Sequence, residues 1–115
     1  MMTEIFAQGD LLIERVPYVA PSGAIEENAE GAAMVLAEGE ATGHRHAIRE
    51  RVTMFRDDRL ARDIPVGLYV GHVQVSSAYA RVTHDEHAPL TLPRGTYRVR
   101  RQRELGPRDA RVVTD

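Results

Sequence analysis

The stretch LYVGHVQVSSAYARVTHDEHAPLTLPRGTYRVRR, residues 68–101, alternates apolar and polar side chains over most of its length. Alternation with a period of two predicts β-strands that bury one face. The strands predicted from this pattern cover residues 68–75, 78–84 and, running past the quoted stretch, 96–105. The turn-forming residues expected between them are Ser76, Ser77, Pro93, Arg94 and Gly95.

The same pattern extends outward to the rest of the chain, where short β-rich segments alternate with Gly, Pro, Ser and Asp. Further strands are predicted at residues 4–8, 11–16, 32–38 and 44–55. We interpret residues 25–31 (IEENAEG) as a loop rather than a helical turn. No segment sustains the apolar period of an amphipathic helix, which is about 3.6 residues. Many short strands at this spacing predict an all-β fold, a small single-domain barrel or sandwich.

The length of 115 residues fits one domain, which we expect to span residues 1–115. Within it, we expect residues 106–115 to form a loosely held tail, unless residues 111–113 add an edge strand. The chain has no cysteine, which excludes disulfides, thiolate metal sites and cysteine nucleophiles. It also lacks an apolar run of membrane-spanning length, and its first ten residues lack the pattern of a signal peptide. These features predict a cytoplasmic protein.

Charge is distributed unevenly along the chain. Residues 1–40 carry eight acidic residues and one arginine, whereas residues 93–115 carry seven arginines and three acidic residues. The basic stretch TYRVRRQREL, residues 96–105, would suit phosphate contacts, but the net charge of −2 and the few aromatic residues argue against a nucleic-acid-binding protein. We favour ion pairs between the acidic and basic regions, either inside one barrel or between the subunits of a homo-oligomer.

Four of the five histidines lie in two short windows, GHRH and THDEH. Side chains of equal parity share one face of a strand. On that rule His44 and His46 lie on the apolar face of one strand, and His84 extends the apolar face of another. His87 follows beyond a bend. The remaining histidine, His72, has no partner nearby in the sequence, and we interpret it as a surface or edge residue.

Imidazoles that point toward one another form a nitrogen site for a divalent transition metal ion, here zinc, iron or manganese. The expected metal ligands are His44, His46, His84 and His87. The nearby carboxylates are Glu50, Asp85 and Glu86. Either Glu50 or Glu86 is a candidate general base, although a glutamate in mid-strand more often pairs with an arginine or reaches solvent. The competing interpretation treats the histidines as ordinary hydrogen-bonded residues.

The spacing H-x-H-x3-E formed by His44, His46 and Glu50 resembles the first motif of the cupin superfamily. That resemblance implies a small double-stranded β-helix barrel in which these three side chains bind a metal ion inside the barrel. The second cupin motif has P-x-G before its histidine. In this chain the P-x-G sequence at 93–95 follows the second histidine pair instead. The second ligand set is therefore expected to come from that pair.

Most of the chain, from QGDLL to RVRRQREL, also resembles a family of short bacterial proteins of uncharacterised function. The leading functional hypothesis is a small metal-binding β-barrel with an inward histidine site that is open to a small-molecule ligand. Whether such a protein is an enzyme is left open. The alternative is a non-catalytic barrel that serves as a binding or assembly module in a homo-oligomer. The sequence names neither a substrate nor a reaction.

Overall fold

The computed structural model describes residues 4–39 and 42–102, and in them the chain is all-β, as predicted. The strands are β1 (Ile5–Gln8), β2 (Leu11–Val16), β3 (Ala24–Glu27), β4 (Met34–Glu38), β5 (Arg45–Ile48), β6 (Thr53–Arg56), β7 (Tyr69–Thr83) and β8 (Leu90–Arg101). In these residues the one helical element is a short 3-10 turn, η1 (Asp58–Leu60), so no described helix is long enough to cross a membrane. The predicted tail at 106–115 and the optional strand at 111–113 lie outside the described residues.

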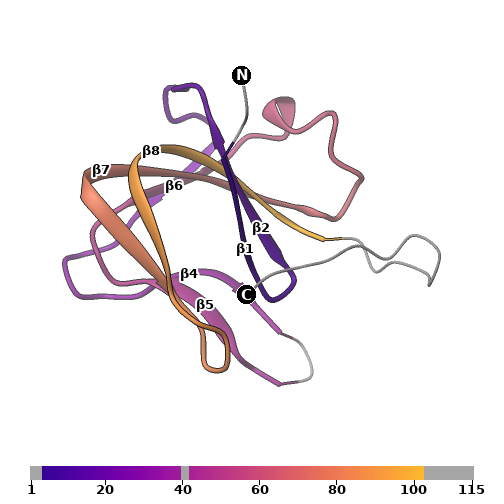
Figure 1. The fold of residues 1–115 in the computed structure, drawn as a ribbon. Helices are drawn as coiled ribbons and strands as arrows, with labels where there is room; N and C mark the ends of the chain where they lie inside the picture. Colours follow the sequence, from indigo (N-terminus) through magenta and orange to yellow (C-terminus); the bar gives the residue numbers. More distant parts are fainter. Residues whose placement is uncertain (1–3, 40–41, 103–115) are drawn as a thin grey trace.

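The described strands form one antiparallel sheet. Its hydrogen-bonded order is β1-β2-β8-β7-β5-β4, with β6 pairing β7 and carrying β3 on its other side. One edge of β7 pairs with β8 along most of its length, while the other edge pairs first with β6 and then with β5. Figure 1 shows β7 and β8 arching together across the molecule, with β4 and β5 below them.

The two long strands run through residues that were predicted to form turns, so the prediction of separate strands was wrong here. β7 contains the expected Ser-Ser turn and β8 contains the expected Pro-Arg-Gly turn. The register of the pair shifts between Val75 and Tyr79, opposite Gly95 and Pro93. The residues predicted to form turns therefore lie at an irregularity inside the two strands, and this irregularity bends both strands. Pro93 is tolerated because, among the described strands, this part of β8 pairs on one edge only.

The bend folds the sheet onto itself and encloses one main core. The fully buried side chains come from β2, β5, β7 and β8 and include Leu11, Ile13, Ile48, Val73, Val82, Leu92 and Tyr97. His46 and Ile48 on β5, and Ala80 and Val82 on β7, are buried as parity predicts, whereas Ala47, which parity places on the opposite face of β5, is buried as well. Each fully buried aliphatic side chain contributes roughly 1.5–3 kcal/mol. The core therefore holds the two parts of the folded sheet together.

A smaller buried region surrounds His72, which was predicted to be a surface or edge residue. That prediction was wrong, because His72 is 2% exposed and its ring stacks on Phe55. A register shift after Tyr69 adds one residue to β7 and brings Tyr69 and His72 to the same face. The Tyr69 hydroxyl accepts the backbone N–H of Asp57 at 3.3 Å, and its oxygen lies 2.7 Å from His72 Nδ1, with which it also forms a hydrogen bond. Burial, followed by the charge of Arg98, lowers the pKa of His72.

A corner centred on Asn28 divides the strand predicted at 44–55 into β5 and β6, so that strand is not continuous. Asn28 is 8% exposed, and its amide nitrogen donates to the carbonyls of Ala32 and Glu50 at 2.8 and 2.9 Å. Its Oδ1 accepts the N–H of Val52 at 2.8 Å. The bonds to Glu50 and Val52 satisfy backbone groups of the segment between β5 and β6. In this segment the chain passes from the end of β7, which pairs with β5, to the first half of β7, which pairs with β6.

β3 occupies a segment that was predicted to be a loop. It pairs with β6, and all four of its residues are exposed. An exposed edge strand needs no alternating apolar face, so this part of the sequence carries no period-two signal. The charges of Glu26 and Glu27 on this edge oppose pairing with another chain.

The predicted pairing of acidic and basic regions is confirmed within one chain. Arg98 on β8 bonds to Glu14 on β2 at 2.9 Å and to Asp63 at 2.8 Å. Arg101, also on β8, bonds to Asp10 in the β1–β2 turn at 2.7 Å. Because β2 and β8 are neighbours in the sheet, the acidic start of the chain lies beside its basic last strand.

Replacing Asn28 should destabilise the fold through the corner rather than through the core. We expect Asn28→Ala to lower the free energy of unfolding by roughly 2–4 kcal/mol, because it leaves several buried backbone groups without partners. Asn28→Asp should cost less, because it keeps the acceptor for Val52. Urea denaturation followed by circular dichroism measures both, with the exposed neighbour Glu30→Ala as control. Values for both variants within about 0.5 kcal/mol of wild type would contradict this role.

Candidate functional site

The site begins at the tight turn between β1 and β2. The strands pair up to Gln8 and Leu11, which leaves Gly9 and Asp10 as a two-residue loop. Gly9 has a φ of 58° and Asp10 a negative φ, which is the pattern of a type II′ hairpin turn. A Cβ on Gly9 would lie 2.8 Å from His87 Nε2. Both the turn and the imidazole that packs against it therefore require glycine.

Gln8, the last residue of β1, is fully buried and reaches across the end of the folded sheet. Its Nε2 donates to the carbonyl of Val82 on β7 at 3.0 Å and to that of Ala88 in the β7–β8 loop at 2.8 Å. The opposite orientation of the amide would direct its oxygen at two other carbonyl oxygens. The amide orientation is therefore fixed, with Oε1 facing His46.

The amide of Gln8 determines which nitrogen of His46 carries the proton. His46 Nδ1 lies 2.8 Å from Gln8 Oε1, which can only accept, so Nδ1–H donates and Nε2 keeps its lone pair in the neutral ring. Burial lowers the pKa of His46, and the His84 imidazole lowers it further, whereas Asp10 acts in the opposite direction. The neutral ring with a free lone pair is the form of histidine that binds metals.

The lone pair of His46 faces a carboxylate. Asp10 Oδ1 lies 3.5 Å from His46 Nε2, and the other Asp10 oxygen accepts a hydrogen bond from Arg101 at 2.7 Å. Arg101 also donates to the carbonyl of Glu38 on β4 at 3.0 Å, which ties the β1–β2 turn to the far strand of the sheet. Two ligand atoms on a tetrahedral zinc ion lie roughly 3.4 Å apart. His46 and Asp10 thus have the spacing of two metal ligands.

His44 immediately precedes β5, and its side chain is partly exposed. Its Nδ1 donates to Glu86 Oε1 in the β7–β8 loop at 3.0 Å, since a carboxylate can only accept. The lone pair of the neutral ring is therefore on Nε2. A histidine whose second nitrogen donates to a carboxylate is a common arrangement among metal ligands. His44, like His46, has the tautomer of a ligand that binds through Nε2.

His84 has the opposite tautomer. It directly follows β7, and its Nδ1 accepts the backbone N–H of Glu86 at 3.0 Å and that of His87 at 3.2 Å. The proton of the neutral ring is therefore on Nε2. Turning the ring over would leave these two N–H groups facing a carbon atom. His84 thus presents an N–H donor to its neighbours, rather than a lone pair.

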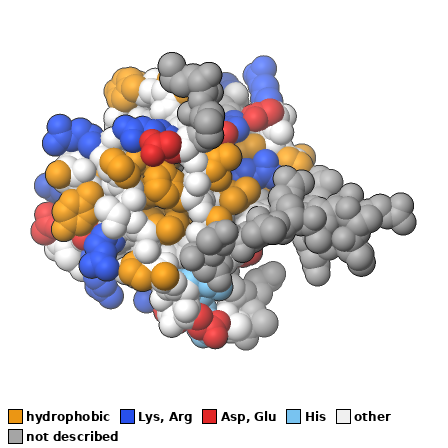
Figure 2. All heavy atoms as spheres, viewed as in Figure 1, with side chains coloured by type: hydrophobic (Ala, Val, Ile, Leu, Met, Phe, Trp, Pro, Cys, Tyr) orange, Lys and Arg blue, Asp and Glu red, His pale blue; other side chains and the backbone are white. Residues whose placement is uncertain are grey.

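The fold brings His44, His46, His84 and His87 together, and we call these four residues the histidine cluster. His84 is the central ring, with its centroid 4.4 Å from that of His46 and 4.6 Å from that of His87. The centroid of His44 lies 5.6 Å from that of His84. Figure 2 shows histidine side chains reaching the surface at the lower end of the molecule, beside acidic side chains.

The ligand atoms do not already converge on one point. Within residues 4–39 and 42–102, no group of three or more His, Asp or Glu side chains is arranged to hold a metal ion as it stands. Gln8 fixes His46, whereas Asp10 and Glu86 have more than half of their side chains exposed, at 56% and 66%. Any metal ion would therefore be enclosed by movement of the exposed side chains around a fixed His46.

Glu50 makes a different contact from the one that the H-x-H-x3-E spacing implies. Its Oε1 accepts the backbone N–H of Arg81 at 2.7 Å, at the corner that follows β5. Asp85 is exposed in the β7–β8 loop. Of the three carboxylates considered from the sequence, Glu86 is the one that bonds to a histidine of the cluster, His44.

Sequence reasoning missed Gln8 and Asp10. Asp10 lies between the strands predicted at residues 4–8 and 11–16, so its place in a turn was implied, but no role was predicted for its carboxylate. Gln8 has the same parity as Phe6, which packs against the core. The signal available in the sequence was therefore the parity of Gln8, which places a polar side chain on the inward face of its strand. Neither the partners of Gln8, some 74 and 80 positions away, nor the tautomer they impose could be derived without the fold.

Comparison with known proteins places this region in a family. The sequence profile of a family described as a domain of unknown function (DUF8820) matches residues 7–102. The matched region contains the β1–β2 turn and the whole histidine cluster. Searches of the curated proteins and of the solved structures give no match. The chain therefore belongs to the DUF8820 family, a domain of unknown function.

Proposed function

We propose that His44, His46 and His87 of the histidine cluster, together with Asp10, bind one divalent transition metal ion, such as zinc, iron or manganese. The observation that carries the proposal is the fixed tautomer of His46, whose lone pair faces the Asp10 carboxylate at 3.5 Å. Two electron-rich atoms at this distance repel each other unless a proton or a metal ion lies between them. A metal ion bound to both atoms would turn that repulsion into attraction.

His44 and His87 complete the proposed ligand set. His44 contributes a lone pair on Nε2, because its Nδ1 is bonded to Glu86. His87 Nε2 and His46 Cε1 both lie within 3.5 Å of the point that a Cβ of Gly9 would occupy, so the two rings flank the same turn. Imidazole nitrogen and carboxylate oxygen are ligands that zinc, iron and manganese accept. A fifth position on the ion would then be open to water or a small molecule.

Closing the site requires little energy. Asp10 would turn away from Arg101, and an exposed ion pair of this kind contributes about 0–1 kcal/mol. His44 is partly exposed and can rotate, whereas His46 stays in place. The cost of these movements is small beside the binding energy of a transition metal ion, which is about 10 kcal/mol or more in structural zinc sites.

His84 has a different part in the proposal. Its Nε2 carries a proton while Nδ1 bonds to the backbone, so it donates a hydrogen bond instead of binding the metal. The acceptor would be a ligand oxygen of Asp10 or a molecule at the open position. The cupin-like motif is then used only in part: His44 and His46 act as ligands, and Asp10 takes the place of Glu50.

Metal titration of purified variants tests the ligand set. We expect zinc or manganese to bind at one equivalent per chain, as measured by calorimetry and by elemental analysis after desalting. His46→Ala and Asp10→Asn should weaken binding by roughly a hundredfold or more, since each removes a ligand. His84→Asn should weaken binding less, by roughly tenfold, because it removes a hydrogen bond to the site rather than a ligand, and asparagine can still accept the backbone N–H groups of the loop.

Glu50→Gln is the matched control, because it alters the third position of the H-x-H-x3-E spacing outside the proposed ligand set. It should bind metal like wild type. Failure of the folded wild-type protein to bind zinc, iron or manganese, or normal binding by His46→Ala, would contradict the proposal. A metal-free oligomer that is insensitive to chelators in light scattering would favour an assembly module instead.

The lowered pKa of His46 makes a second, independent prediction about the metal-free protein. A base whose pKa is lower in the folded than in the unfolded chain stabilises the fold above its unfolded pKa, near 6.5. That stability is lost as the pH falls below this value, because the unfolded chain then binds the proton more readily. We therefore expect the free energy of unfolding to decrease from pH 7.5 to pH 5.

His72 acts in the same direction as His46, because its pKa is also lowered. The comparison that isolates His46 is therefore wild type against His46→Gln, by urea denaturation at each pH. The variant should lose less stability on acidification than wild type. An equal or greater loss in His46→Gln would show that His46 does not titrate as the structure indicates.

A further inference from the structure

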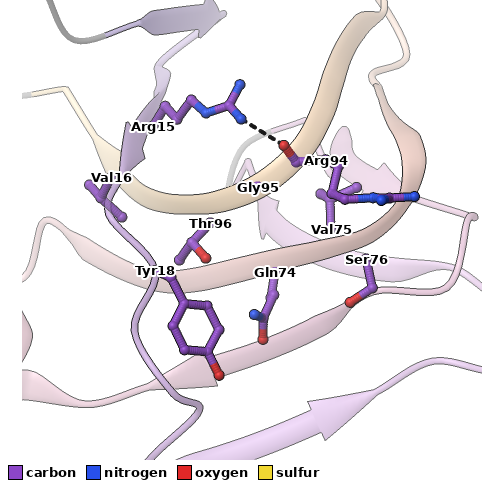
Figure 3. A pocket seen from close by; sticks show the side chains of 9 residues that line it. All are labelled: Arg15, Val16, Tyr18, Gln74, Val75, Ser76, Arg94, Gly95 and Thr96. Atoms are coloured by element: carbon purple, nitrogen blue, oxygen red, sulfur yellow. Dashed lines mark hydrogen bonds between the residues drawn. The ribbon is translucent and has the colours of Figure 1, made fainter.

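A hollow of about 420 Å³ lies over the bend of β7 and β8, at the opposite end of β2 from the Gly9–Asp10 turn. Its lining comes from β2, the segment after β2, and the bent middle of β7 and β8. Figure 3 shows Tyr18, Gln74 and Ser76 in a row on one side of β8, with the guanidinium of Arg15 on its other side. The size suits one small organic molecule.

The bend itself creates this hollow. The register shift between Val75 and Tyr79 lifts the intervening residues of β7 out of the regular ladder, and they are exposed. On β8, a Cβ at Gly95 would lie 3.0 Å from Arg15 Nη2. Because Gly95 has no side chain, Arg15 can lie against the backbone and donate to the carbonyl of Arg94 at 2.8 Å. Irregularities of this kind are enriched beside binding sites.

The charge of the hollow is positive. Arg15 and Arg94 both line it, and no acidic side chain is among its lining residues. Arg15 is partly neutralised by Glu4, whose carboxylate lies 3.2 Å away. Arg94 donates from Nε to the carbonyl of Ser77 at 3.3 Å, and within the described residues its guanidinium has no carboxylate partner. The two Nη groups of Arg94 can therefore receive a carboxylate in the paired geometry that arginine favours.

The rest of the lining is suited to a flat organic body. The Tyr18 side chain is 68% exposed, which is unusual for so large an aromatic residue, and Val16 lies beside it. The hydroxyl of Thr96 and the amide of Gln74 have no hydrogen-bond partner in the described part of the protein and are accessible, since every buried side-chain nitrogen or oxygen there has a partner. A bare phosphate or sulfate would leave the aromatic and apolar lining uncovered.

We propose that this hollow binds a small organic carboxylate with a flat apolar body. The carboxylate pairs with the guanidinium of Arg94, and the body lies against Tyr18 and Val16. Thr96 and Gln74 hydrogen-bond to polar substituents of the ligand. The site is separate from the histidine cluster and does not depend on a metal ion.

Two-dimensional amide NMR with benzoate as the probe tests this site in the metal-free protein. Benzoate should give saturable shifts at the backbone amides of Gln74 and Thr96. Benzamide, the neutral compound of the same shape, should bind at least tenfold more weakly, because it cannot form the ion pair with Arg94. Adding a metal ion should not change the affinity for benzoate.

Variants then assign the contacts. Arg94→Gln and Tyr18→Ala should each weaken benzoate binding about tenfold, whereas Arg81→Gln, an exposed arginine of β7 outside the hollow, should leave it unchanged. Shifts that stay linear with benzoate concentration, equal binding of benzamide, or unchanged binding by Arg94→Gln would each overturn the proposal. Loss of metal binding at the histidine cluster with benzoate binding intact would leave this proposal standing.

Discussion

The side-chain amide of Gln8 is the contact on which the end of the folded sheet depends. It joins β1 to the end of β7 and to the β7–β8 loop through Val82 and Ala88. These two carbonyls fix the amide orientation, and the amide in turn fixes the proton of His46 on Nδ1. One buried residue therefore both closes the sheet and sets the chemistry of the imidazole beside it. Its loss would remove a partner of the buried Val82 carbonyl and the partner of Nδ1 on the buried His46 ring, which is costly in a low-dielectric interior.

The bend of β7 and β8 organises the rest of the molecule. It allows one antiparallel sheet to enclose a core, and it separates two regions of different chemistry at the two ends of β2. At the Gly9–Asp10 end, four imidazoles gather beside the Asp10 carboxylate, which suits a cation. At the other end, Arg15 and Arg94 border an aromatic hollow, which suits an organic anion. A folded sheet that held the two proposed sites would bind an ion and a small molecule at opposite ends, with or without catalysis.

Much of the fold was predictable from local pattern, and the exceptions share a physical cause. Strand β2 was predicted with its observed bounds, and the burial of His46 and Ile48 on β5 and of Ala80 and Val82 on β7 followed from parity. The predicted turns within β7 and β8 failed because turn-forming residues also occur at bends inside long strands. The fold gathers the four histidines that the sequence singled out. Their tautomers, and the part of Asp10, depend on hydrogen bonds between distant segments and could not be read from the sequence.

The most direct test of this account is the position of the imidazole protons in the metal-free protein, measured by long-range ¹H–¹⁵N correlation NMR at neutral pH. The account predicts that neutral His46 carries its proton on Nδ1 and that neutral His84 carries it on Nε2, two opposite tautomers in adjacent rings. Addition of zinc should then shift Nε2 of His46 and leave the tautomer of His84 unchanged. A proton on Nε2 of His46 would contradict the account, because that nitrogen could then not face Asp10 as a metal ligand.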